Sequence, residues 1–125
     1  MQYVSTRGGV APIGFKDAIL MGLATDGGLI VPDVVPSAEG HLDEWVGLSY
    51  SELAFQVIRL FSDDISDEDL ARMVAASYSR FDHPSVAPLV DVGSLSVLEL
   101  FHGPTLAFKD IALQFLGELF AHVLS

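Results

Sequence analysis

Apolar side chains recur every three or four residues at several places in this chain of 125 residues, and this spacing predicts amphipathic helices. The clearest helix follows Ser49, because Ser49 and Glu52 have the spacing of a capping box and an unbroken apolar face comes next. A second helix is predicted after Ser66, where three acidic residues suit the positive end of the helix dipole. An earlier helix is expected over residues 15–23, with the sequence DGG at 26–28 as its stop.

Short extended segments lie between these helices. Residues 2–6 and 29–32 favour brief strands, and the stretch between residues 33 and 47 is rich in proline, glycine and acids and predicts a loop. Residues 88–92 and 96–101 predict two further strands joined by a Gly-Ser turn. The expected fold class is therefore mixed α/β, with a small β-sheet flanked by helices.

The final helix raises a specific question about Lys109. Gly103 and Pro104 should end the preceding strand, and Thr105 is expected to cap the helix. A polar stripe is then predicted, with the members Asp110, Gln114, Glu118, His122 and Ser125. Lys109 instead shares its side with an apolar stripe, which contains Leu113, Leu116 and Phe120. The pattern thus predicts that the ammonium group points toward the protein interior.

A lysine placed in this way is suited to covalent chemistry. Burial and the positive end of a helix dipole both disfavour a charged ammonium, and only an uncharged amine can attack an aldehyde to form a Schiff base. The alternative is structural: Lys109 extends from the first helical turn to solvent, or pairs with Asp110 or Glu99. Periodicity alone leaves both interpretations open.

Composition narrows the range of partners. Seventeen acidic and six basic residues give a net charge of −11, which argues against nucleic acid and anionic membrane surfaces. Half of the residues are hydrophobic, more than a self-contained domain of this length needs, so some apolar surface should face a partner. The chain has no cysteine, and its beginning lacks the features of an export or transit segment, so the expected compartment is the cytoplasm.

The order of motifs resembles the threonine synthase family over essentially the whole chain. The segment ELFHGPT at 99–105, followed by AFKD at 107–110 and ALQF at 112–115, is similar to the family's pyridoxal-phosphate lysine segment. The sequence YVSTR at 3–7 and the sequence from Gly22 to Pro32 resemble its amino-terminal part. The resemblance implies the amino-terminal portion of a fold-type II pyridoxal-phosphate enzyme.

The same resemblance implies an activity. Threonine synthases are carbon-oxygen lyases acting on phosphates, which convert O-phosphohomoserine and water to threonine and inorganic phosphate. Lys109 would be the catalytic residue and would bind pyridoxal phosphate as a Schiff base, with Phe108 shaping the cofactor pocket. Asp110 would orient the helix rather than react. The same lysine would also suit another pyridoxal-phosphate lyase acting on hydroxyamino acids, which explains the amino-terminal motifs poorly.

Arg7 and the histidines are further candidates for the functional site. Arg7 in the sequence STRGG could belong to an anion-binding turn, but a solvated arginine at a strand end is the preferred interpretation. His102 could lie near the cofactor, although a turn histidine bonded to backbone is preferred. The four histidines have no metal-ligand spacing, and without cysteine no metal site is expected.

One departure from the family pattern affects the expected activity. No glycine-rich phosphate loop follows Lys109, so residues 1–88 are expected to form the amino-terminal domain and residues 89–125 a truncated start of the cofactor-binding domain. The isolated chain should then lack most of the cofactor site and be inactive. The competing hypothesis is a non-catalytic fragment or paralogue that self-associates through exposed apolar helix faces.

Overall fold

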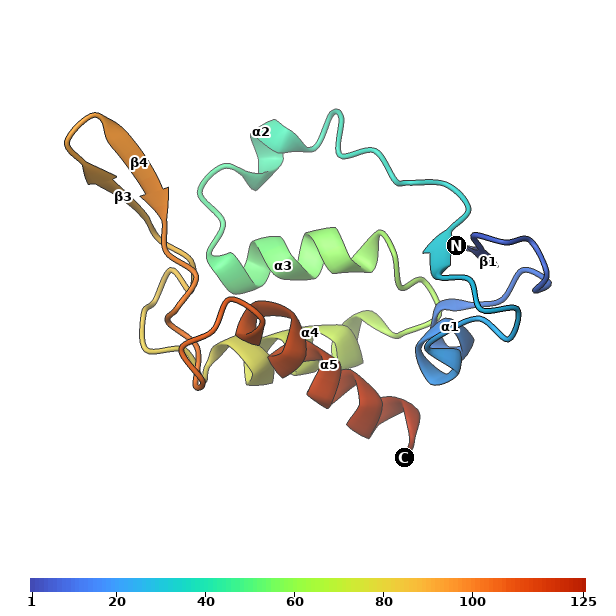
Figure 1. Cartoon of the computed structure of the whole chain (residues 1–125). Helices are drawn as coiled ribbons and strands as arrows, with labels where there is room; N and C mark the ends of the chain where they lie inside the picture. Colours follow the sequence, from blue (N-terminus) through green and yellow to red (C-terminus); the bar gives the residue numbers. More distant parts are fainter.

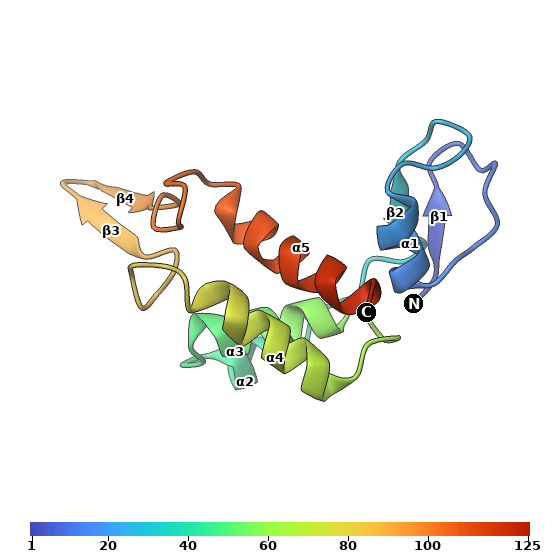
Figure 2. The ribbon, with the colours of Figure 1, turned by 90° about the horizontal axis from the view of Figure 1, so that it is seen from below.

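The computed structural model describes all residues from 1 to 125. In chain order the elements are β1 (Tyr3–Ser5), α1 (Phe15–Met21), β2 (Ile30–Pro32), α2 (Leu42–Trp45), α3 (Tyr50–Arg59), α4 (Asp67–Tyr78), β3 (Leu89–Val92), β4 (Leu95–Leu98) and α5 (Asp110–Val123). Three long helices, α3, α4 and α5, form the body of the molecule (Figure 1). A lobe of β1, β2 and α1 lies at one end of this body, and the β3–β4 hairpin projects from the other end (Figure 2).

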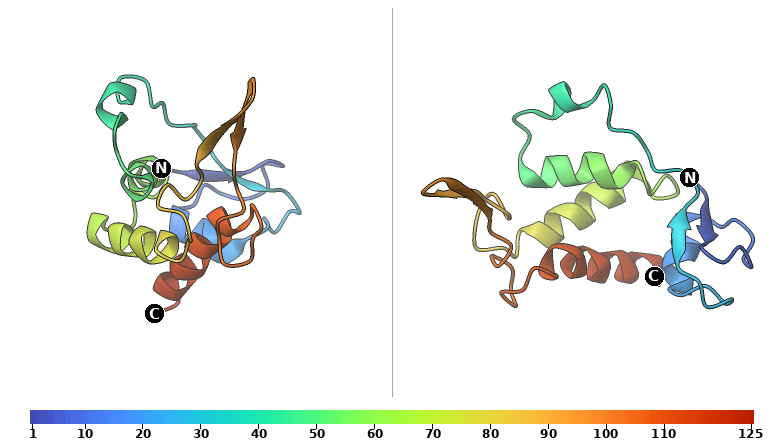
Figure 3. Two further views of the ribbon diagram at one scale, coloured as in Figure 1. Left: turned by 90° about the vertical axis from the view of Figure 1, so that its left-hand side faces the viewer. Right: turned by 45° about the horizontal axis from the view of Figure 1, so that its top comes forward.

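The predicted mixed α/β class is confirmed, but the β structure is divided. Two separate antiparallel sheets form, one from β1 and β2 and the other from β3 and β4, where a single small sheet was expected. In the second sheet Leu89 pairs with Leu98, and the turn is made at Gly93, whose positive φ of 64° suits a residue without a side chain. Figure 3 shows this hairpin standing clear of the helices.

Helix α4 forms the centre of the hydrophobic core. Leu70, Met73 and Val74 on its inner side are fully buried, as the spacing after Ser66 predicted. Helices α3 and α5 pack against α4, and α5 contributes Leu119, which is 2% exposed. The core is small for the length of the chain, because many large apolar side chains elsewhere stay exposed.

The two predicted helix caps are confirmed. Ser49 N–H donates to Oε2 of Glu52 at 2.7 Å, and Ser49 Oγ accepts from the Glu52 N–H at 3.3 Å, which completes the capping box of α3. Ser66 Oγ accepts from the Asp69 N–H at 3.1 Å at the start of α4. Both caps are local, so a single stretch of sequence was enough to find them.

One predicted helix boundary was wrong, and one short helix was missed. Helix α1 ends at Met21 rather than at residue 23, because Gly22 with φ of 66° turns the chain. The stretch between residues 33 and 47 contains the short helix α2, which the pattern missed. None of the residues of α2 is buried, so this helix gives no periodic hydrophobic signal.

The last helix begins later than predicted. Residues 103–109 form turns, and α5 starts at Asp110 with Lys109 as its N-cap, whereas Thr105 was expected to cap it. The Thr105 hydroxyl donates to the Asp110 carboxylate instead of accepting a backbone N–H. None of the helices has both the length and the apolar composition needed to cross a bilayer.

Candidate functional site

Lys109 lies where the turn of residues 103–109, here called the lysine turn, passes into α5. Its backbone is helical, and its carbonyl accepts from the Leu113 N–H at 2.8 Å, so the residue is fixed at the first turn of the helix. Its side chain is exposed. The prediction that this ammonium group points into the interior is therefore wrong for this structure.

The reason is that α5 is rotated relative to the expected orientation, although Leu116 of the apolar stripe still packs against the core. The predicted polar stripe faces the protein, where Arg80 donates to Gln114 Oε1 at 3.2 Å and pairs with Glu118. Leu113, on the same side as Lys109, is 53% exposed. The sequence grouped these residues on the correct sides, but it could not tell which side is covered.

Several residues close to Lys109 in the sequence have exposed apolar side chains. Phe108, beside Lys109, is 65% exposed, and the neighbouring exposed apolar side chains belong to Phe101, Leu106 and Leu113. These four residues and Lys109 are called the lysine face below. Exposed aromatic and aliphatic groups around one amine are typical of a surface that is covered in a larger assembly.

Asp110 is buried, whereas the sequence pattern predicted that Lys109 would be. Its side chain is 1% exposed, and its carboxylate accepts from the Thr105 N–H at 2.8 Å and the Thr105 hydroxyl at 2.9 Å. Gln114 Nε2 donates to the same carboxylate at 3.3 Å. Burial acts to raise the pKa of Asp110, but the hydrogen bonds from Thr105 and Gln114 outweigh it, so the pKa is lowered. Asp110 is thus an ionised, buried group that ties the lysine turn to α5.

The Asp110 side chain packs against Gly103. Gly103 is buried, and a Cβ placed on it would overlap the Asp110 side chain, so only glycine fits. Its carbonyl accepts from the Leu106 N–H at 3.0 Å. Leu106 adopts a positive φ of 59°, a strained conformation that the surrounding hydrogen bonds maintain. The lysine turn is therefore built tightly although its outer side chains are exposed.

His102 lies between two carboxylates. Its Nε2 is 2.7 Å from Oε2 of Glu99, and its Nδ1 is 2.9 Å from Oδ1 of Asp82. The hydrogen bond with Glu99, followed by the one with Asp82, raises the pKa of His102 against the opposing effect of burial. The preferred expectation, a ring bonded to backbone, is wrong. The partner Asp82 lies twenty positions earlier in the sequence, and no local pattern signals it.

Arg7 is not brought near Lys109. It lies in the lobe of β1 and β2, which packs near the carboxyl-terminal end of α5, whereas Lys109 is at the other end (Figure 2). The Arg7 side chain is exposed and donates to the Asp26 carbonyl at 3.0 Å, which agrees with the preferred interpretation. The nearby backbone N–H groups of Gly9 and Gly28 donate to the Asp26 carboxylate. This turn already holds an anion of the chain itself.

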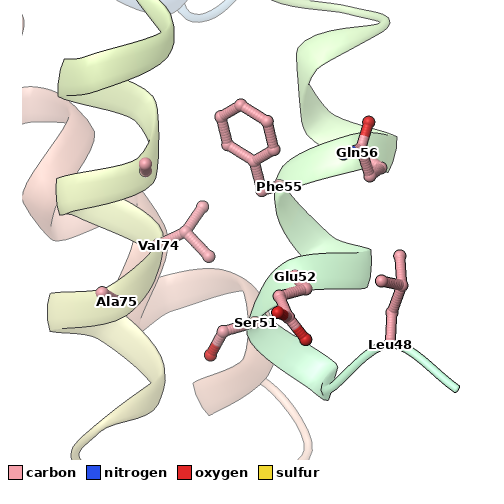
Figure 4. A pocket seen from close by; sticks show the side chains of 8 residues that line it. Leu48, Ser51, Glu52, Phe55, Gln56, Val74 and Ala75 are labelled. Atoms are coloured by element: carbon pink, nitrogen blue, oxygen red, sulfur yellow. The ribbon is translucent and has the colours of Figure 1, made fainter.

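A hollow of about 390 Å³ lies between α3 and α4 (Figure 4). Phe55 and Val74 line it, and Glu52 is the only ionisable group in its wall. Because Glu52 is engaged in the capping box, this hollow offers no free reactive group. The structure has no group of three or more His, Cys, Asp or Glu side chains that could hold a metal ion.

Comparison with known proteins gives a consistent result. The family described as "Threonine synthase N terminus" matches residues 2–78. The chain is 51% identical to threonine synthase of Pseudomonas aeruginosa and 47% identical to that of Schizosaccharomyces pombe, in both cases over 100% of the chain. It covers 27% and 25% of those two proteins, so the chain spans about a quarter of the length of its curated relatives.

Solved structures agree with the sequence relatives. The crystal structure of PLP-bound threonine synthase from Brucella melitensis matches with a TM-score of 0.93 and 48% identity, over 99% of this chain and 27% of that one. Yeast threonine synthase matches with a TM-score of 0.92 and 44% identity, over 98% and 26% of the two chains. The fold described above is therefore that of the first quarter of these enzymes.

Proposed function

The chain belongs to the threonine synthase N-terminal family, and from this premise we propose that it carries the cofactor lysine, Lys109, of a threonine synthase. The complete protein would convert O-phosphohomoserine and water to threonine and inorganic phosphate, as a carbon-oxygen lyase that uses pyridoxal phosphate. The observation that carries the proposal is the position of Lys109. It is an exposed amine on a tightly built turn, next to a buried and ionised carboxylate.

The residues of this chain fit one end of the cofactor. An unhindered primary amine suits an aldehyde, and Lys109 has no ion-pair partner among the salt bridges of the structure. Phe108 and Leu106 offer apolar contacts beside it. The lysine face contains no further cation and no glycine-rich loop for a phosphate group. We therefore assign the phosphate-binding residues to the part of the protein that the longer relatives possess in addition.

The roles of this chain's residues follow from the geometry. Bound pyridoxal phosphate supplies an electron sink for the bonds at the substrate's α-carbon. Lys109 would hold the cofactor through Nζ and would accept and return protons at that atom. Phe108 would shape one side of the cofactor pocket, and Asp110 keeps the turn in place by accepting from Thr105.

The domain division is proposed on the same basis. Residues 1–88 would form the amino-terminal domain, and residues 89–125 would begin the cofactor-binding domain. Two features support this division: β3 begins at Leu89, and the hairpin stands apart from the helical body (Figure 3). The cytoplasm is proposed as the compartment on the basis of the composition, which includes no cysteine.

A second candidate function rests on the lysine face. Its exposed apolar side chains would also suit a non-catalytic module that associates with a second copy of itself. In this alternative Lys109 is a solubilising charge among apolar groups. The two hypotheses make different predictions: replacement of Lys109 abolishes phosphate release only if Lys109 binds the cofactor.

The test of the proposed function uses the complete protein that carries this segment. Release of inorganic phosphate from O-phosphohomoserine should be lost in Lys109→Ala and kept in Lys16→Ala, since Lys16 lies on α1 in the other lobe. Unchanged phosphate release in Lys109→Ala would refute the assignment.

A further inference from the structure

The histidine before the lysine turn has an arrangement that only one protonation state satisfies. Both ring nitrogens of His102 face carboxylate oxygens, at 2.7 Å to Glu99 and 2.9 Å to Asp82. A neutral imidazole has a single N–H, so one nitrogen would direct a lone pair at a carboxylate. An imidazolium has two N–H groups and satisfies both partners at once. The geometry therefore requires the cation.

The surroundings of His102 support the same state. Its side chain is 15% exposed, and the ring centroid of His83 lies 4.9 Å away. His83 Nδ1 accepts from the Ser85 N–H at 3.1 Å, so at that atom His83 carries no proton. The hydrogen bonds with Glu99 and Asp82 raise the pKa of His102 against the opposing effect of burial.

The His102 arrangement also joins two segments distant in sequence. Asp82 lies four residues after the end of α4, and its N–H donates to the His102 carbonyl at 3.0 Å. The same stretch is fixed in the core by Val86, which is buried. The ring contacts and this backbone bond together hold residue 102 against the helical body. We call this set of contacts between His102, Glu99 and Asp82 the histidine clasp.

The clasp is linked to Lys109 through Gly103 and Asp110. Gly103 follows His102 directly, and the Asp110 side chain packs against Gly103 without room for a methyl group. Asp110 accepts from Thr105 and is the first residue of α5, directly after Lys109. A displacement of residue 102 would therefore move the glycine against which Asp110 packs, and with it the turn that carries Lys109.

We propose that His102, held as an imidazolium between Glu99 and Asp82, is a positioning residue for Lys109. It acts through Gly103 and Asp110 and does not touch the cofactor. Its importance for catalysis rests on the proposed function of Lys109, whereas the clasp itself is a property of this chain. Because the charged ring is required, the lysine turn should loosen when His102 loses its proton.

The clasp is tested by nuclear magnetic resonance on the 125-residue chain. Ring nitrogen shifts of the four histidines are followed with pH. His102 should keep two protonated ring nitrogens as the pH rises past the ordinary histidine value of about 6.5. A His102 that has already lost a ring proton at or below that value would overturn the proposal.

The effect on the turn is read from amide hydrogen exchange at Thr105 and Leu106, whose N–H groups bond to Asp110 and Gly103. Exchange is expressed relative to Gly28, whose N–H is also bound by a carboxylate but in the other lobe. In His102→Gln the relative exchange of both amides should rise by about tenfold, and His83→Gln should leave it unchanged. The wild-type chain should show the same rise as pH passes the pKa of His102, so the test does not depend on the variant folding.

Kinetic measurements on the complete protein separate a positioning role of His102 from an effect on stability alone. His102→Gln should lower kcat with little change in KM and remove an alkaline limb from the pH profile, while His83→Gln keeps both. If Lys109→Ala proves fully active, the proposed function fails, but the resonance and exchange results still decide whether the clasp exists. Unaltered exchange at Thr105 and Leu106 in His102→Gln would overturn the positioning role.

Discussion

The Asp110 side chain packs directly on Gly103, seven residues earlier, and leaves no space for a Cβ atom there. Asp110 is 1% exposed, and its carboxylate is bound by Thr105 and Gln114. This contact closes the lysine turn from the inside. Lys109 is thereby held on the outside of a tightly built turn, as its proposed role requires.

Replacing Gly103 by alanine should destabilise the chain, because the added methyl group overlaps the Asp110 side chain. The expected loss is about 1–3 kcal/mol in the free energy of unfolding, measured by urea denaturation. Gly117→Ala is the matched control, since nothing lies within 4 Å of a Cβ at that position in the interior of α5. It should stabilise by about 0.5–1 kcal/mol. Equal effects of the two changes would contradict the packing described here.

Acid should weaken the fold in part through Asp110. The pKa of its carboxyl is lowered in the folded state, so its stabilising contribution is complete above the unfolded value of about 3.9 and is lost as pH falls through the folded value. Urea midpoints measured between neutral pH and about pH 2 should therefore fall less steeply in Asp110→Asn than in the wild type. Asp17→Asn, on the exposed side of α1, should retain the wild-type slope. An unchanged slope in Asp110→Asn would argue against a bound, ionised carboxylate.

Deprotonation of His102 should lower the stability of the fold on the alkaline side. The pKa of His102 is raised in the folded state, so its contribution is complete below the unfolded value of about 6.5 and disappears as pH rises through the folded value. Urea midpoints should therefore decline on the alkaline side in the wild type. His102→Gln should abolish this decline. If the variant declined like the wild type, another group would be responsible.

The two sides of α5 should respond differently to truncation. Leu119→Ala should cost about 2–5 kcal/mol, because this side chain is 2% exposed in the core. Leu113→Ala should change stability by less than about 0.5 kcal/mol, since it lies on the exposed lysine face. Sedimentation velocity adds a second measurement: if the lysine face drives self-association, Leu113→Ala weakens it. Similar losses of stability in both variants would contradict the observed orientation of α5.

The parts of the fold that depend on neighbouring residues could be predicted from the sequence. The capping box of Ser49 and Glu52 and the hairpin turn at Gly93 are examples, because the groups that bond lie within a few positions of each other. The grouping of α5 side chains into a polar and an apolar stripe was also correct. These features need no knowledge of what packs on the helix.

The parts that depend on distant residues were not predicted. The side of α5 that faces inward depends on packing of Leu119 in the core and on Arg80, which binds Gln114 and Glu118 from more than thirty positions away. Asp82 completes the histidine clasp from twenty positions before His102. The start of α5 was misplaced for a local reason, because Asp110 binds Thr105 and the intervening residues form turns.

Lys109 is proposed to hold the cofactor, and direct mapping of the attachment site tests this role. The complete protein is incubated with pyridoxal phosphate, and borohydride reduction makes the link between a lysine and the aldehyde permanent. Peptide mass spectrometry then locates the adduct. We expect one modified residue, Lys109, and no adduct in Lys109→Arg, while Lys16→Arg is modified like the wild type. An adduct on a different lysine, or one that persists in Lys109→Arg, would contradict it.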